Sequence, residues 1–427
     1  MRIGRGLRVT AAALAGMAAL AACGGGGDAG DSGPASLRMT VWTANEQHLA
    51  LFNQIADEYK KSHPNVTGIT FDPLPFDTYT TSLTTQIAGG NAPDLAWVFE
   101  NSAPDFVSSG ALLPLDEKLR STEGYRYDDL APGPLKLWQD DGKLYGYPFS
   151  TSPFGVFVNT DLLKAAGQKT PAELIAAGQW NWQTALGAAA AVQGETGKAG
   201  LVIRDFDYKG WDNLSTFWTG WGAAAWSEDG KSCGFASPEM VDAMTTLHKA
   251  IFVDKALPGP GTTADFFAGD AAMTVTQISR ASLLKDGGFG WDLVPLPAGP
   301  KGTYAVIGQG GIGVLKQGKH TDAALDFLAY LTNPDNSTKL AQFFPPPRQS
   351  QLTAETLAKT NPKLKPEQLQ KVVVDGITNG VVKPNHTGQA ELSQQVRAAL
   401  DPLWTPNADV KAVLDGVCAK IQPLLAK

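Results

Sequence analysis

The stretch that most constrains the fold of this chain runs over residues 89–101. Before it, apolar residues recur every fourth position from Tyr79 to Ile87, which predicts one face of a helix ending at the Gly89-Gly90 pair. Residues 95–99 then form a continuous apolar run of strand length. Such a run is typical of a strand buried on both faces of a parallel sheet.

Polar residues follow this strand and an earlier one. Residues 37–41 alternate apolar and polar side chains and predict a strand, and residues 67–71 predict the next. Strand, helix, strand, helix, strand is a parallel doubly wound pattern, so the loops after the first and third strands should open on the same edge. Ligands bind outside the carboxyl ends of such strands, so the loop residues become candidates for ligand binding: Trp42, Asn45, Glu46, Glu100 and Asn101.

The beginning of the chain predicts export and a lipid anchor. Three arginines precede an apolar stretch over residues 9–22 that is too short to cross a bilayer, so residues 1–22 form a signal peptide. The sequence Leu-Ala-Ala-Cys that ends at Cys23 resembles the lipobox of bacterial lipoproteins, which implies that Cys23 is acylated, with a chain such as palmitate. Residues 23–36 are rich in glycine and should be a flexible tether on the outer face of the membrane.

Composition limits the classes of partner. Loss of the three signal-peptide arginines lowers the formal net charge from -7 to -10, which argues against nucleic-acid binding. Apart from Cys23, the cysteines are Cys233 and Cys418, and an isolated pair in an exported chain favours a disulfide over a metal site. The 11 tryptophans suit a sugar-binding protein, although tryptophan is also a core residue.

The remaining chain alternates predicted helices and strands. Residues 144–149 and 154–159 are extended, with a break at 150–153 that we interpret as a crossing between lobes. Residues 211–221 are rich in aromatic side chains, and 238–252 predict an amphipathic helix with Pro238 in its first turn.

The chain resembles solute-binding lipoproteins of bacterial ATP-driven (ABC) importers, in the family of maltose-binding and glycerol-3-phosphate-binding proteins. The resemblance rests on segments in family order over nearly the whole mature chain: residues 20–23, 41–42, 89–95, 109–115, 142–148, 157–163, 267–273 and 321–331. It implies an α/β fold with two lobes, each a mainly parallel sheet flanked by helices, and a ligand cleft between them. The first lobe would comprise residues 37–150 and 304–344, and the second 151–303 and 345–427.

The family comparison also implies site residues. Asn45, Glu46, Glu100 and Asn101 fall in first-lobe loops that touch ligand, and Trp211 falls where maltose-binding protein has a stacking tyrosine. Arg397 falls at a cleft arginine. The full set of expected ligand-binding residues adds Trp42, Trp218, Trp221 and Arg348, the last of which follows three prolines and has a surface salt bridge as its alternative role.

Three other chemistries have partial signals in the sequence. Residues 308–313 match G-x-G-x-x-G but lack the helix and acidic residue of a dinucleotide site, so a glycine-rich strand returning to the first lobe is favoured. A lipid-anchored glycosidase would need two carboxylates facing a cleft, for which Glu46, Glu100, Asp205 and Asp207 are available. A glycerophosphodiester could replace the sugar as ligand.

The sequence therefore predicts a monomeric binding protein without enzymatic activity, cofactor or metal. It would capture a sugar or a glycerophospho solute and deliver it to separate permease subunits in the membrane. Maltodextrin itself is disfavoured as the solute, because two stacking tryptophans of maltose-binding protein fall near Ser279 and Ser393.

Overall fold

The computed structural model describes residues 34–204, 210–361 and 363–426. The predicted signal peptide, Cys23 and the tether up to residue 33 lie outside the described residues, as do Asp205 and Asp207. The first strand begins at Ala35, two residues before the expected start of the folded part. No helix within these described ranges is long and apolar enough to cross a membrane.

The first part of the sheet follows the predicted order. β1 (Ala35–Val41), α1 (Glu46–Ser62), β2 (Val66–Pro73), α2 (Tyr79–Ala88) and β3 (Leu95–Phe99) succeed one another along the chain. β1 lies between β2 and β3 and runs parallel to both. Parallel neighbours end at the same edge of a sheet, so the polar loops after β1 and β3 open on one edge, as the sequence predicted.

Two long strands connect this sheet to the rest of the molecule. β10 (Val306–Val314) pairs antiparallel with β3 and also with β6 (Tyr147–Asn159), which gives the strand order β2-β1-β3-β10-β6-β8-β7. The break predicted at residues 150–153 is wrong: β6 is continuous there, and Pro153 pairs with Ile307. The main-chain ladder with β10 keeps this serine-rich and proline-containing segment extended.

The second part of the sheet is mixed. β7 (Ala199–Ile203) and β8 (Ala271–Gln277) are parallel, whereas β6 runs antiparallel to β8 and to β9 (Trp291–Val294). The short strand β11 (Val381–Val382) pairs in parallel with the start of β10. Helices cover the second part, the longest being α8 (Trp182–Thr196), α10 (Pro238–Phe252), α16 (Gln389–Leu400) and α17 (Val410–Leu425).

Shorter elements complete the chain. They include the short helices α3 (Ala103–Ser108), α4 (Asp116–Ser121), α6 (Thr160–Ala165), α7 (Pro171–Ala176), α9 (Ser215–Trp218), α11 (Thr321–Leu331), α12 (Pro334–Leu340), α13 (Ala354–Thr360) and α15 (Asp375–Asn379), and the single-turn helices η1 (Phe76–Thr78) and η5 (Trp211–Leu214). A separate ribbon consists of β4 (Gln139–Asp140) and β5 (Lys143–Leu144).

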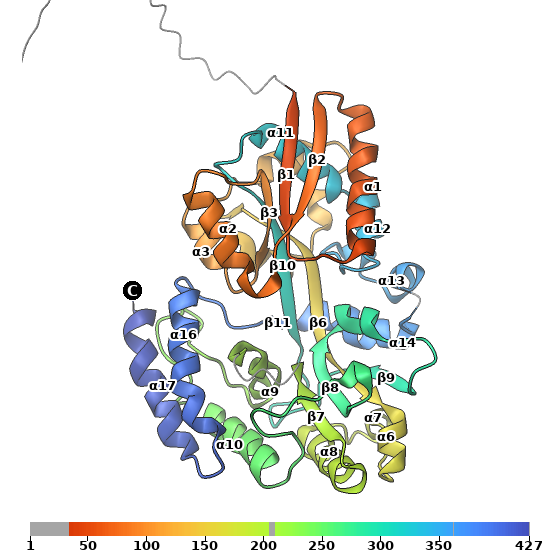
Figure 1. The fold of residues 1–427 in the computed structure, drawn as a ribbon, viewed down its shortest axis with the longest axis vertical. Helices are drawn as coiled ribbons and strands as arrows, with labels where there is room; N and C mark the ends of the chain where they lie inside the picture. Colours follow the sequence, from red (N-terminus) through yellow and green to blue (C-terminus); the bar gives the residue numbers. More distant parts are fainter. Residues whose placement is uncertain (1–33, 205–209, 362, 427) are drawn as a thin grey trace, which may run out of the picture. The chain divides into compact units, whose positions relative to one another are not determined.

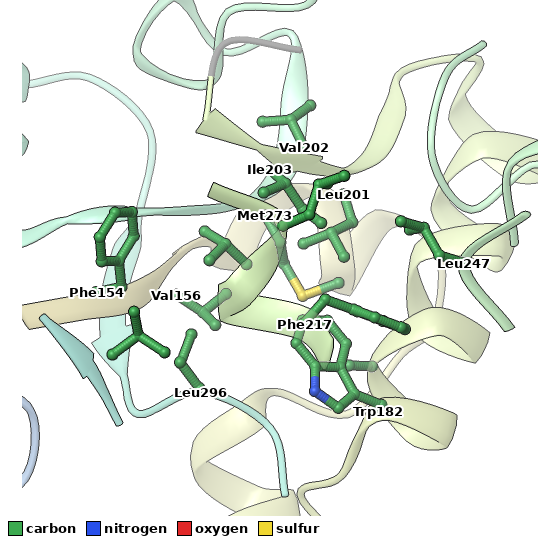
Figure 2. Close-up of a cluster of buried hydrophobic side chains, with 14 of the residues drawn as sticks. Phe154, Val156, Trp182, Leu201, Val202, Ile203, Phe217, Leu247, Met273 and Leu296 are labelled. Carbon is green, nitrogen blue, oxygen red and sulfur yellow. The ribbon is translucent and has the colours of Figure 1, made fainter. Parts of the chain in front are cut away.

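The buried apolar side chains form two separate cores. The first core draws on residues 35–149 and 312–344, and the second mainly on residues 154–306 and 357–425. In Figure 1, β1, β2 and β3, which contribute to the first core, lie at one end and β7, β8 and β9, which contribute to the second, lie toward the other, with β6 and β10 running between them. Side chains from β6, β7 and β8 meet α8 and α10 inside the second core (Figure 2).

A disulfide fastens the last helix to the second core. Cys418 of α17 is bonded to Cys233, with 5.4 Å between their Cα atoms and a sequence separation of 185. Gln422, one turn further along α17, accepts a hydrogen bond from the Cys233 amide at 2.9 Å and donates one to the Lys231 carbonyl at 2.7 Å. The loop around Cys233 is therefore held to α17 both covalently and by hydrogen bonds.

The glycines of β10 make room for large side chains at the centre of the sheet. A Cβ atom at Gly311 would lie 2.5 Å from the ring of Trp138, and one at Gly313 would lie 2.6 Å from Leu112. A Cβ atom at Gly310 would lie 2.7 Å from the ring of Trp42. The strand interpretation of the G-x-G-x-x-G segment is thus confirmed, and its glycines serve packing.

We predict that Gly311→Ala destabilises the protein by about 1–3 kcal/mol, because the added methyl group overlaps the buried Trp138 ring. Gly187→Ala is the matched control: this exposed glycine of α8 has no atom within 4 Å of the added Cβ, so the change should stabilise the helix by about 0.5–1 kcal/mol. Urea denaturation of both variants measures the difference. Equal stability of the two variants would contradict the packing role of Gly311.

Candidate functional site

The loops after β1 and β3 meet through aromatic rings. Trp42 follows β1 and stacks on Phe99 at the end of β3, with 4.3 Å between ring centroids and 20° between planes. The edge of Trp42 rests on Gly310, where β10 has no side chain. Trp42 is only partly buried, so part of its indole remains accessible, and Glu100 and Asn101 directly follow Phe99, on which it stacks.

A lysine from the second core lies against Glu100. Lys383 Nζ is 2.9 Å from Glu100 Oε1 and 2.8 Å from Asp212 Oδ2 of η5, and its third neighbour is Asn213 Oδ1 at 3.4 Å. Glu100 is 8% exposed and Lys383 6%. We call Glu100, Asp212 and Lys383 the charged triad; it joins a first-core strand end to two segments of the second core.

The triad keeps its lysine charged. Burial by itself lowers the pKa of Lys383, but the nearby Asp212 and Glu100 carboxylates outweigh burial and raise it above its ordinary value of 10.5. A pKa that is raised on folding stabilises the folded state at all pH values below the ordinary one, and the contribution disappears only as the pH rises through the folded value. The ion pairs therefore persist at neutral pH.

A second group of side chains lies at the same junction of the two cores. Arg204, at the end of β7, donates a hydrogen bond to Gln277 Oε1 of β8 at 3.0 Å. Its guanidinium lies 5.9 Å from the ring centroid of Phe76, which contacts Phe99 of β3. Phe76 is 50% exposed, an unusual position for a large apolar ring. The chain therefore gathers polar, charged and aromatic groups from both cores at one place.

Comparison with known proteins shows the family of this chain. The family model described as bacterial extracellular solute-binding protein matches residues 43–338. This chain belongs to that family. An uncharacterized lipoprotein of Streptomyces antibioticus is 24% identical over 321 residues, which cover 72% of this solute-binding protein and 69% of the relative.

Solved structures share the fold. A substrate-binding protein of Listeria monocytogenes in complex with cycloalternan superposes with a TM-score of 0.79 at 21% identity, covering 91% of this chain and 98% of that one. A protein of Mycobacterium tuberculosis in complex with glycerophosphocholine gives 0.75 at 18% identity, covering 92% and 99%. At these identities the likeness shows that this solute-binding protein has the two-lobed fold of such proteins.

Two of the expected ligand residues begin α1. Asn45 caps the helix: its Oδ1 accepts hydrogen bonds from the amides of Gln47 at 2.9 Å and His48 at 3.4 Å. Glu46 is exposed in the first turn, where its negative charge interacts favourably with the helix dipole. Both follow Trp42 within four residues, and their side chains make no described contact with the charged triad.

The structure places Trp211, Trp218 and Trp221 inside the second core. They are 2%, 1% and 6% exposed. Trp211 lies against Trp218 at 6.3 Å and Phe235 at 5.8 Å, and Trp221 stacks on Phe217 at 4.6 Å. Their ring faces are occupied by other aromatic side chains, which differs from the expected stacking on a sugar. Trp211 instead precedes Asp212 and fixes where that carboxylate emerges.

The two arginines expected to bind ligand differ in burial: Arg348 is buried and Arg397 is exposed. Arg348 is 0% exposed and belongs with first-core elements: its guanidinium donates to the Thr332 carbonyl at 2.8 Å and lies 4.7 Å from the Tyr125 ring. It is neither in a cleft nor on the surface, because the proline turn before it packs on the first core. Arg397 is exposed on α16, nine residues from its N-cap Gly388 and so about 14 Å along the helix.

Sequence reasoning missed three residues of the junction: Lys383, Asp212 and Arg204. Lys383 follows the apolar pair Val381–Val382, and Arg204 follows Ile203, so both are polar residues directly after a strand. The rule that identified Glu100, that polar residues directly after a strand are candidates, would have found Lys383 and Arg204. Within the described part of the chain, no group of three or more His, Cys, Asp or Glu side chains is arranged to hold a metal ion.

A hollow of about 470 Å³ lies elsewhere, on the second core between α16 and α17. Its lining is mainly apolar and includes Ala399, Pro402, Ala412 and Val413. It receives no residue from the first core and no member of the charged triad. We therefore place the candidate site at the junction, where charged side chains from both cores meet.

His48, close to the loop after β1, yields a pH prediction. It lies against the rings of Phe343 and Phe344, with centroid distances of 4.5 and 5.0 Å, and burial lowers its pKa from 6.5 to about 4. The unfolded chain binds the proton first, so the free energy of unfolding should fall as the pH drops from 6.5 to about 4. Since the ring is partly solvated, we expect a loss of about 1–2 kcal/mol.

Chemical denaturation of His48→Gln and of the parent protein across this pH range tests whether His48 causes this loss of stability. Above pH 6.5 the two stability curves should run parallel, and below it the variant should lose less stability. Curves that stay parallel down to pH 4 would show that His48 does not contribute to the acid sensitivity.

Proposed function

We propose that this protein is the solute-binding component of an ABC importer, held on the outer face of the membrane by a lipid on Cys23, and that its solute is an uncharged carbohydrate. The observation that carries the ligand class is the charged triad: acidic and basic groups from both cores meet in it, and its Glu100 directly follows Phe99, on which Trp42 stacks. Permease and ATPase subunits would be separate chains. Support for the lipid anchor comes from the sequence around Cys23 and from the lipoprotein relative.

The balance of charge favours a neutral solute. Among the described residues at the junction, Glu100 and Asp212 are acidic and Lys383 and Arg204 are basic. Carboxylates accept hydrogen bonds from hydroxyl groups, and ammonium or guanidinium groups donate to them, so a polyhydroxylated molecule can use both kinds. An anionic solute would meet two carboxylates as well as the two cations, so these four groups offer it no net positive charge. The accessible part of Trp42 offers an apolar surface for the C–H face of a sugar ring.

The site would comprise residues from both cores: Trp42, Glu100 and Asn101 from the first, and Asp212, Asn213 and Lys383 from the second. Solute groups would exchange with the direct contacts between Lys383 and the two carboxylates. Trp211 would act as a positioning residue for Asp212, since its ring faces are covered. Closure of both cores around the solute excludes water and strengthens each hydrogen bond.

A thermal-shift screen tests this function. The panel contains mono-, di- and oligosaccharides together with glycerophosphocholine, and each hit is followed by calorimetry and by product analysis of the solute. We expect a raised Tm and a chemically unchanged solute with at least one neutral saccharide. Binding of glycerophosphocholine alone would replace the carbohydrate proposal, and appearance of cleaved product would show a hydrolase.

Glu100→Gln tests the placement of the site. The variant keeps the shape of the side chain but loses the charge, so it should weaken binding of the saccharide found in the screen by about 1.5–3 kcal/mol, the range for a hydrogen bond to a charged group. Glu117→Gln is the matched control, because Glu117 is an exposed carboxylate of the same core, on α4. Calorimetry measures both. Equal affinities would place the site elsewhere.

A further inference from the structure

One short segment of the second core, residues 383–388, carries two contacts to first-core carboxylates. It connects β11 to α16, beginning at Lys383 and ending at Gly388. At its start, Lys383 pairs with Glu100; at its end, the Gly388 amide donates a hydrogen bond to Asp105 Oδ1 at 2.6 Å. In Figure 1, α16 rises toward the helices that follow β3.

The contact at Gly388 supplies a helix cap from the other core. Gly388 is the N-cap of α16, and it has no side chain with which to satisfy the free amides of the first turn. Its φ of 75° is in the left-handed region, which suits glycine. A carboxylate beside the positive end of a helix dipole is stabilised, and Asp105 satisfies one of the free amides, that of Gly388 itself.

The two first-core carboxylates belong to one rigid stretch. Glu100 follows β3 directly, and Asp105 lies five residues later in α3, whose Phe106 and Ala103 are buried in the first core. The segment 383–388 is likewise fixed in the second core at both ends, by β11 and by the buried Leu392 of α16. Any rotation of one core against the other therefore breaks both contacts together.

We propose that residues 383–388 form an electrostatic latch, which Glu100 and Asp105 hold by charge and which keeps the two cores together. Every contact of the latch is made by groups of the chain itself, so it requires no solute. Solute binding would exchange only the Lys383 end, at the charged triad, while the Asp105 end would remain. Asp105 thus acts on closure without touching the solute.

Hydrogen–deuterium exchange of the whole protein, measured by mass spectrometry without added solute, tests the latch. Asp105→Ala removes the acceptor of the Gly388 amide. We expect exchange to become at least several-fold faster at Gly388 and, because the cores separate, also across 381–388 and across 100–106 on the opposite core. Asp105→Asn keeps an oxygen acceptor and should restore part of the protection.

Asp128→Ala is the matched control, since Asp128 is a fully solvated first-core carboxylate that pairs only with Arg120 among its described partners. It should leave exchange in both segments unchanged. Acceleration confined to the Gly388 amide in Asp105→Ala would reduce Asp105 to a local cap and overturn the latch. Unchanged exchange everywhere would overturn the contact itself.

The latch does not rest on the proposed function, and its failure is distinguishable from failure of that function. Exchange is read without solute, whereas the saccharide screen reads a shift in Tm. For a saccharide found in that screen, Asp105→Ala should raise the Kd several-fold, because a smaller fraction of molecules has the cores together before binding. A Kd equal to that of Asp128→Ala would contradict this consequence.

Discussion

The antiparallel ladders of β10 are the interaction on which the rest of this structure depends. β10 pairs with β3 on one side and with β6 on the other, and both β6 and β10 run between the two cores. Because strands on either side contribute main-chain hydrogen bonds, the crossing is ordered while each core keeps its own buried side chains. The glycines of β10 then let Trp138 and Trp42 approach the sheet more closely than any Cβ would permit.

This crossing also determines where charge can be buried. Glu100 emerges from β3 next to β10, and Lys383 emerges from β11, which pairs with the other end of β10. A buried ammonium without partners would be costly, but two carboxylates and an amide oxygen surround Lys383. The charged triad is therefore both a contact between the cores and a set of groups suited to hydroxyl ligands.

The tryptophans of this chain differ in burial, and this difference separates candidate ligand contacts from core residues. Trp42 remains partly accessible at a strand end, whereas Trp211 packs among Trp218, Trp226 and Phe235 inside the second core. In sequence both follow or lie near strands and both have polar neighbours. The difference arises from what covers each ring: Trp218 of α9 and Phe235, from the segment before α10, lie against Trp211 of η5.

The sequence alone determined the succession of elements up to β3, the parallel direction of β1, β2 and β3, and the edge at which Glu100 emerges, since these depend on local periodicity and on the direction of neighbouring strands. It also indicated the family through short segments spread along the chain. Only the tertiary structure decided that Lys383 and Asp212 meet Glu100, that Asp105 caps α16, and that Arg348 is buried. These outcomes depend on contacts between residues more than 100 positions apart, or on the packing of a turn, which no local pattern encodes.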